Sequence, residues 1–256
     1  DYLSLDVEPI RLAMNAGVFE LGWNVHNFGQ VLSLTETALR EDVEVGTPPG
    51  GSVASVDDLR LQLLSDQGIR VVAQPILRLM DRHPIAYELT RRGPAGSGFE
   101  APRRFFNLAR SEGFVFAVDN NCLNTCLQAA RALGLAVPVH INVLPTTLQR
   151  MTPLALEALC EGFAPKTLTL ELSEEAFLGG AAALRGPCET LKRLGVRISI
   201  DDLGRARGTI DNVVFLHPDV VKLAGGLTNG ASQDVRKAGT IKRIVALAAA
   251  LGCDLV

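Results

Sequence analysis

Short apolar runs recur along the later part of the chain, separated by stretches with helical spacing. The last four runs begin roughly 20 to 30 residues apart. That interval is the length of one strand-plus-helix unit, so it predicts a parallel sheet. The runs are IRVVAQPI (69–76), PIAYEL (84–89), VPVHINV (137–143), LTLEL (168–172), RISID (197–201) and VVKL (220–223).

Three of these runs alternate between polar and apolar residues. Because alternate side chains of a strand share a face, each of the three strands would have one polar face. A doubly wound open sheet is covered by helices on both faces and is apolar on both. A closed barrel has its helices outside and opens at the C-terminal strand ends, so the alternation favours a barrel. The polar positions are His140 with Asn142, Thr169 with Glu171, and Ser199 with Asp201.

Oxygen-bearing side chains gather at the ends of the predicted strands. Converging carboxylates repel one another and lose solvent, and a hard cation such as Mg²⁺ or Mn²⁺ would relieve both effects. Two cations sharing Asp201 would form the usual device for phosphodiester hydrolysis. For any single residue, the alternative is a cap on the helix that follows. The candidates are Glu88, Asn142, Glu171 and the adjacent pair Asp201 and Asp202.

Lys222 ends the strand that follows the aspartate pair. Taken alone, it is typical of a surface lysine whose stem lies along apolar side chains. Next to the carboxylates, it could instead stabilise the negative charge that develops during phosphodiester hydrolysis.

Composition narrows the partners and the compartment. The chain is 47% hydrophobic but only 5% aromatic, which suits an α/β core of aliphatic residues. Its net charge of −3 gives no long-range attraction for DNA. Five scattered cysteines without a CxxC pair predict reduced thiols in a cytoplasmic protein, and the dispersed histidines form no evident zinc cluster. The longest apolar run, residues 244–251, is too short to span a membrane.

Six ordered motifs from residue 69 onward resemble the EAL domain family, whose members hydrolyse or bind cyclic di-GMP on a modified TIM barrel. The resemblance implies an α/β fold, a modified TIM (β/α)8 barrel, incomplete at the C-terminal end of this chain. The motifs are QPI (74–76) with YELTRRGP (87–94) for Q-P-I and E-A-L-x-R, INVLP (141–145) for N-x-S-P, ELSE (171–174) for E-x-T-E, IDDLG (200–204) for D-D-F-G, and PDVVKL (218–223) for P-D-x-I-K-I.

The resemblance also implies a role for each matching residue. Glu88 and Asp201 would be catalytic, together with Lys222, which would assist the attacking water. Gln74 and Arg92 would face the dinucleotide, and Glu174 would anchor the loop after the aspartates. The implied protein is a cytoplasmic bacterial signalling enzyme that opens cyclic di-GMP to linear pGpG and forms homodimers through this domain. Two Mg²⁺ or Mn²⁺ ions would be held by Glu88, Asn142, Glu171, Asp201 and Asp202.

Departures from the family pattern keep a second hypothesis open. The family's D-F-G-x-G-x-S-S loop is DLGRARGTI here, with Leu203 in place of the phenylalanine. The aspartate of K-I-D is replaced by Ala224. The chain also stops at Val256, before the family's A-E-G-V-E segment. The alternative to an enzyme is therefore a degenerate domain that binds cyclic di-GMP, or a protein partner, without hydrolysis.

The chain divides into three predicted parts. Residues 1–45 weakly resemble the tail of a GGDEF domain, with a sensory segment as the alternative, although no G-G-D-E-F sequence is present. Residues 46–68 are expected to form a Pro- and Gly-rich linker and a helix capped by Ser55 or Asp57. Residues 69–256 are the predicted barrel. The native protein is expected to continue past Val256 with two more strands and an early metal-ligating glutamate.

Overall fold

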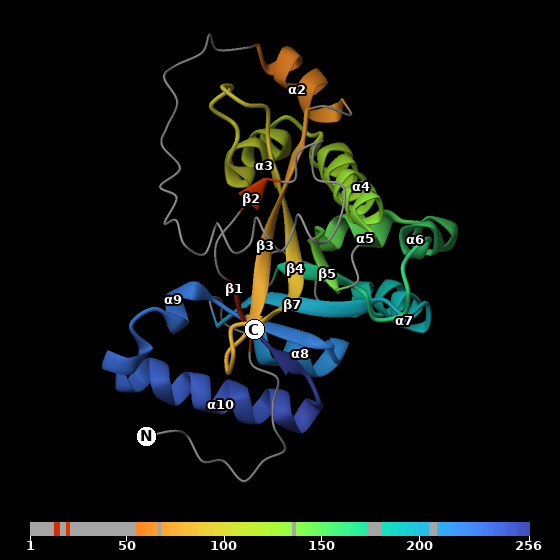
Figure 1. The fold of residues 1–256 in the computed structure, drawn as a ribbon. Helices are drawn as coiled ribbons and strands as arrows, with labels where there is room; N and C mark the ends of the chain where they lie inside the picture. Colours follow the sequence, from red (N-terminus) through yellow and green to blue (C-terminus); the bar gives the residue numbers. More distant parts are fainter. Residues whose placement is uncertain are drawn as a thin grey trace.

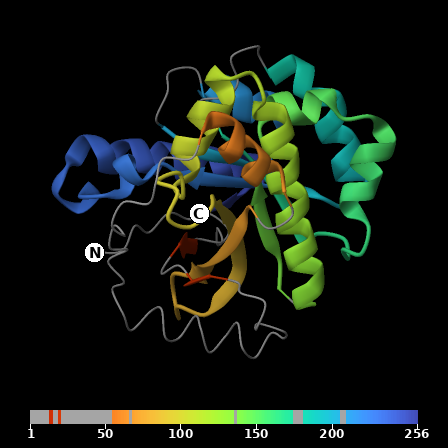
Figure 2. The same cartoon turned by 90° about the horizontal axis from the view of Figure 1, so that it is seen from above.

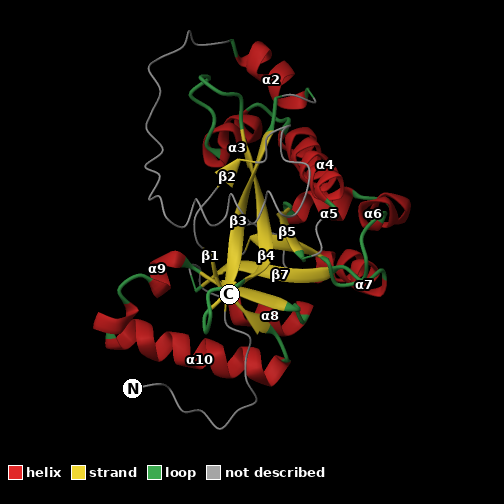
Figure 3. Cartoon of the chain, viewed as in Figure 1, coloured by secondary structure: helices red, strands yellow, loops and turns green. Residues whose placement is uncertain are grey.

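The computed structural model describes residues 13–15, 19–20, 55–65, 68–134, 137–173, 181–204 and 209–256. Its centre is a curled sheet (Figures 1 and 3). The strands are β1 (Ala13–Asn15), β2 (Phe19–Glu20), β3 (Arg70–Arg78), β4 (Pro84–Arg92), β5 (Val139–Asn142), β6 (Leu168–Ser173), β7 (Arg197–Leu203), β8 (Val220–Leu223) and β9 (Asp254–Leu255).

Helices lie around the outside of this sheet, as the view from above shows (Figure 2). In the described part of the chain, none of them is both long and apolar enough to cross a bilayer. The helices are α2 (Val56–Leu64), α3 (Pro102–Ser111), α4 (Val115–Leu133), α5 (Pro145–Arg150), α6 (Pro153–Cys160), α7 (Arg185–Arg193), α8 (Thr209–Leu216), α9 (Gly225–Thr228) and α10 (Val235–Leu251).

The strand order is β1–β3–β4–β5–β6–β7–β8–β9, with β2 also paired to β3. Strands β4 to β9 are parallel, as the spacing of the apolar runs predicts. Strand β3 is antiparallel to β4, which departs from a regular (β/α)8 barrel. The connection over residues 79–83 is too short for a crossover helix, and only an antiparallel hairpin can be closed by so short a link.

The apolar side chains of the parallel strands pack under the helices. Ile141, Leu170 and Ile200 are fully buried in one large cluster. Helix α4 contributes Leu123 and Leu127 to the same cluster, and α6, α7 and α10 cover the strands farther along. The opposite, polar face of β5, β6 and β7 is therefore directed into the curl of the sheet, in agreement with the predicted alternation.

The predicted helix after the linker forms as α2. Ser55 caps its N-terminus by accepting a hydrogen bond from the Asp58 backbone N–H, and the Asp58 carboxylate accepts one from the Ser55 backbone N–H. Leu59 and Leu63 of α2 are buried with Phe105 of α3 in a second apolar cluster. Strands β1 and β2 lie within the predicted N-terminal segment, and its remaining residues fall outside the described ones.

The C-terminal end of the chain continues the strand–helix alternation. Asp234 caps α10, and Gly252 ends it in a left-handed conformation with a φ of 67°. The chain then enters β9, which pairs in parallel with β8 through Val220 and Asp254. The alternation of strands and helices therefore extends to residues 254–255.

Candidate active site

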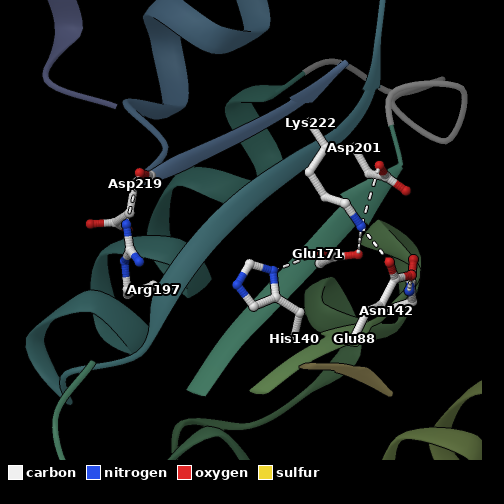
Figure 4. Close-up of polar contacts among 8 residues, drawn as sticks. All are labelled: Glu88, His140, Asn142, Glu171, Arg197, Asp201, Asp219 and Lys222. Carbon is white, nitrogen blue, oxygen red and sulfur yellow. Dashed lines mark hydrogen bonds and ion pairs between the residues drawn. The ribbon is translucent and has the colours of Figure 1, made fainter. Parts of the chain in front are cut away.

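A buried lysine stands at the centre of the carboxylates that end the strands (Figure 4). Lys222 Nζ lies 2.6 Å from Glu88 Oε2 and 2.9 Å from Glu171 Oε2. Asp201 Oδ1 is farther away, at 3.9 Å. Burial alone would lower the pKa of Lys222, but these three carboxylates raise it above its ordinary value. Lys222 is therefore a charged group of the cluster, and the surface-lysine interpretation is wrong because the side chain is buried.

Glu88 comes from β4 and Asn142 from the C-terminal end of β5. The Asn142 side-chain amide donates a hydrogen bond of 3.0 Å to Glu88 Oε1. Glu88 thus has one oxygen on the amide and the other on Lys222. The Asn142 side-chain oxygen takes no part in these two bonds, so it could serve as a metal ligand beside Glu88.

Glu171 is fully buried on β6 and has a corresponding pair of contacts. Its Oε1 lies 2.7 Å from His140 Nδ1, and its Oε2 accepts from Lys222. Burial would raise the pKa of this carboxyl, but Lys222 and His140 outweigh the burial and lower the pKa to about 2. Glu171 is therefore ionised at any physiological pH.

The aspartate pair sits on a bulge in β7. Ile200 is paired with Val221 and Leu203 with Leu223, so Asp201 and Asp202 together oppose the single residue between those partners. Such a bulge redirects side chains and is common beside active sites. Asp202 has a φ of 60°, a left-handed conformation that aspartate tolerates better than most residues.

The bulge shifts the alternation of polar and apolar residues by one position after Asp201 and Asp202. In an uninterrupted strand, Leu203 would share the polar face of Ser199 and Asp201. In the structure Leu203 is buried in the main apolar cluster instead. One extra residue has shifted the alternation, which places two carboxylates at the strand end and leaves the core face intact.

Asp201 is the carboxyl least compensated by its neighbours. Burial raises its pKa to about 7, opposed by Lys222 and reinforced by Glu171, Glu88 and Asp202. Three carboxylates share a single ammonium group here, so the cluster has an excess of buried negative charge.

That excess, and the oxygen donors around it, fit a hard divalent cation. The candidate donors are carboxylate and amide oxygens, which suit Mg²⁺, Mn²⁺ or Ca²⁺ better than zinc. Among the described residues, no three His, Cys, Asp or Glu side chains are close enough to hold a cation by themselves. Lys222 Nζ lies between the carboxylates of Glu88, Glu171 and Asp201 and supplies positive charge there.

The two residues predicted to contact the substrate, Gln74 and Arg92, lie on the β3–β4 hairpin at different distances from Glu88. Gln74 is the cross-strand partner of Glu88, so both side chains lie on one face. Arg92 lies four residues beyond Glu88 at the end of β4, opposite Arg70. Burial lowers the pKa of Arg92, and Arg70 adds to the effect. Glu174, the predicted loop anchor, lies outside the described residues.

Sequence reasoning missed a buried ion pair behind the site. Arg91 Nη2 lies 3.4 Å from Asp119 Oδ1 of α4, and its guanidinium also donates to the Asn142 carbonyl. Asp119 Oδ2 accepts from the Leu144 backbone N–H at 2.9 Å. These bonds fix the end of β5, where Asn142 lies. Asp119 lies in the second turn of α4 without a recognisable motif, so no sequence signal identified it.

A second ion pair lies at the opposite end of β7, where Figure 4 draws Arg197 beside Asp219. Arg197 is 2.6 Å from Asp254 of β9 and donates to the Asp219 carbonyl at 3.1 Å. The Asp219 carboxylate accepts from the Ile198 backbone N–H. At this end Asp254 is paired with Arg197 and Asp219 is bonded to a backbone N–H, whereas Asp201 at the other end shares Lys222 with two further carboxylates.

The curled sheet is covered by helices, and it brings carboxylates and a lysine together on its polar face. These features define the domain as an α/β barrel type with an acidic site. The EAL domain model matches residues 56–256, and the chain belongs to that family. The resemblance drawn from the motifs is confirmed. The match begins after the N-terminal segment, and a GGDEF remnant there is not shown.

Comparison with known proteins agrees with this assignment. The cyclic di-GMP phosphodiesterase NbdA of Pseudomonas aeruginosa is 28% identical over 211 residues, 78% of this chain and 26% of that protein. The chain spans only about a quarter of the length of NbdA and of two other curated relatives that it matches.

Solved structures share the fold. The PaMucR phosphodiesterase in complex with c-di-GMP has a TM-score of 0.67 at 23% identity, covering 79% of this chain and 85% of that one. The calcium and c-di-GMP complex of Klebsiella pneumoniae BlrP1 has a TM-score of 0.65 at 18% identity, covering 87% and 63%. The predicted EAL-type fold is therefore confirmed.

Proposed function

We propose that this chain is a metal-dependent phosphodiesterase that hydrolyses cyclic di-GMP to linear pGpG in bacterial signalling. The observation that carries the proposal is the convergence of Glu88, Glu171 and Asp201 on Lys222 at one end of the sheet. Membership of the EAL family and similarity to the cyclic di-GMP phosphodiesterase NbdA support the same reaction.

The proposed cofactor is a pair of Mg²⁺ or Mn²⁺ ions. When bound, a divalent cation supplies Lewis acidity toward the phosphodiester and lowers the pKa of the attacking water. The calcium in the BlrP1 complex accords with divalent cation use by an EAL neighbour. The residues proposed to hold the ions are Glu88, Asn142, Glu171, Asp201 and Asp202.

The chain's own residues would then orient and stabilise the reacting groups. Lys222, held charged by its carboxylate neighbours, is placed to stabilise negative charge on the phosphate oxygens. Asp201 and Glu88 would orient the attacking water. Gln74, on the same face as Glu88, and Arg92, farther along β4, are proposed to contact the dinucleotide. Glu174 is proposed to anchor the loop after the aspartates.

A second candidate function is a cyclic di-GMP receptor without hydrolysis. Ala224, at the position of a family aspartate, is buried and donates its N–H to the Leu203 carbonyl at 3.1 Å. Leu203 itself is a core residue rather than the family's phenylalanine. Both differences lie beside the aspartate pair, and they favour the receptor more than any other observation does.

Incubation of the full-length protein with cyclic di-GMP and Mg²⁺ or Mn²⁺ separates these functions. Formation of pGpG that stops on addition of EDTA is the expected result, read by chromatography of the nucleotides. Nucleotide binding without pGpG would select the receptor. Sedimentation of the same sample tests the proposed homodimer, for which the exposed Val214 and Phe215 of α8 offer apolar surface.

The raised pKa of Asp201 gives a pH dependence for cation binding. A cation must displace the proton that Asp201 holds below about pH 7, whereas Glu171 is already ionised. In the metal-free protein, the contribution of Asp201 to stability is present below about pH 4 and is lost as the pH rises through about 7. The rise in Tm on adding Mg²⁺ is therefore expected to be larger at about pH 7.5 than at about pH 5.5. An equal rise at both values would contradict this.

The domain division and the location remain part of the proposal. Residues 69–256 are proposed as the catalytic barrel, residues 46–68 as linker and helix, and residues 1–45 as a degenerate GGDEF remnant or a sensory segment. A cytoplasmic location is proposed because the nucleotide substrate is a bacterial intracellular messenger.

A further inference from the structure

Two carboxylates of the site are held in the same way from one strand. Glu88 has Oε1 on the Asn142 amide and Oε2 on Lys222. Glu171 has Oε1 on His140 Nδ1 and Oε2 on Lys222. Asn142 and His140 are two residues apart on β5, so they share its polar face. Strand β5 thus provides one holding group for the glutamate of each neighbouring strand.

The direction of the histidine bond follows from the charge of its partner. An ionised carboxylate accepts hydrogen bonds and cannot donate. Glu171 Oε2 lies 2.9 Å from the Lys222 ammonium group, and this contact favours the ionised carboxylate. His140 Nδ1 must therefore carry the proton, which fixes the ring's tautomer at that nitrogen and leaves Glu171 Oε2 as the oxygen directed at the centre of the site.

Without such a bond, a glutamate carboxylate is loosely oriented. The terminal torsion of Glu is broad and roughly two-fold, so either oxygen could turn toward the centre. His140 is 3% exposed and lies between Glu88 and Thr169 in the sheet register, so its ring is confined by neighbouring strands. A confined donor on Oε1 restricts the torsion to one arrangement.

We propose that His140 is a positioning residue that orients Glu171 for cation binding, as the Asn142 amide orients Glu88. The inference rests on the proposed function, because it concerns the same cation site. Outer partners of metal ligands change metal affinity by about tenfold to a hundredfold when removed. His140 is expected to act through the orientation of Glu171, without itself touching the cation or the nucleotide.

The test compares two amide substitutions that differ in reach. His140→Asn places an amide nitrogen where Nδ1 was, and His140→Gln places it near the position of Nε2. Mn²⁺ affinity, measured by titration calorimetry on the full chain, is expected to fall by about tenfold to a hundredfold in His140→Gln and to change by less than about threefold in His140→Asn. Both variants are polar and of similar size, so loss of folding affects them alike.

Thr169→Val is the matched control. Thr169 is buried on the same face, two residues before Glu171, and its hydroxyl has no hydrogen-bond partner among the described residues. Removing such a hydroxyl is close to neutral, so Mn²⁺ affinity should stay within about twofold of the parent. If His140→Gln also stays within about twofold, the positioning role is wrong while the cation site stands.

A metal-free measurement separates this inference from the proposed function. The proton on His140 Nδ1, bonded to a carboxylate, should give a downfield nuclear magnetic resonance signal in EDTA that is absent from His140→Gln. A parent protein that shows the signal but binds no Mn²⁺ would overturn both the cation site and the positioning role. A parent that binds Mn²⁺ but lacks the signal would overturn the positioning role alone.

Discussion

Replacing Lys222 with methionine should destabilise the metal-free protein by about 3–5 kcal/mol, since removal of one partner leaves buried charges uncompensated. Glu88 and Glu171 would then face each other without the ammonium group that now lies 2.6 and 2.9 Å from them. Hydrolysis should fall by about 10²–10³, the usual loss when one charge-stabilising group is removed. Urea unfolding in EDTA measures the first effect and pGpG formation the second.

Added Mg²⁺ should restore much of the lost stability of Lys222→Met, because a dication can replace the missing positive charge. Lys242→Met on the exposed side of α10 is the control, and it should change the unfolding free energy by less than about 0.5 kcal/mol. An unchanged unfolding free energy for Lys222→Met in EDTA would show that the lysine does not hold the cluster together.

Replacing Asp201 with asparagine should lower the rate of pGpG formation by about 10²–10³ and weaken Mn²⁺ binding. The substitution removes the charge proposed to bridge two cations. Below about pH 4 the metal-free variant should be about as stable as the parent, and as the pH rises through about 7 it should become the more stable of the two, because asparagine cannot ionise in the buried site. Asp201→Asn should thus lower activity and Mn²⁺ affinity without lowering stability, whereas Lys222→Met should lower both activity and stability.

Glu157→Gln is the control for that experiment, since Glu157 lies exposed on α6. It should leave the rate of hydrolysis and the affinity for Mn²⁺ unchanged. Full activity of Asp201→Asn would refute metal bridging by this residue, and it would leave Glu88, Asn142, Glu171 and Asp202 as the candidate ligands.

The alternation of polar and apolar residues along the strands was the most informative feature of the sequence. Polar residues at alternate positions of β5, β6 and β7 placed Asn142, Glu171 and Asp201 on one face, and the structure brings their strands together around Lys222. This prediction succeeded because a strand's period of two is enforced by its backbone and does not depend on distant contacts.

Features that depend on the pairing of distant residues could not be predicted in the same way. The bond between His140 and Glu171 joins residues 31 positions apart, and only the register of β5 with β6 brings them together. Arg91 and Arg92 are adjacent and identical in type, yet Arg91 forms the buried pair with Asp119. Alternation along β4 puts Arg92 on the face of Glu88 and Arg91 on the opposite face, but only the packing of α4 against the sheet brings Asp119 to Arg91.

The bulge in β7 also depends on the neighbouring strand, since it is defined by the residue that β8 offers opposite the aspartates. Adjacent carboxylates can be read from the sequence, but their two-against-one pairing cannot. The antiparallel β3 is a different case, because the five-residue link over 79–83 already excludes a crossover helix.

Because of the bulge in β7, Asp202 is one residue more than the pairing with β8 requires. If Asp202 were deleted, Leu203 would follow Asp201 directly and would still fall on the core face by ordinary alternation. The strand would lose a residue with a φ of 60° and regain an unbroken ladder with β8. Loss or gain of a single codon can therefore remove or restore one carboxylate of the site, while the packing of the strand before and after it stays the same.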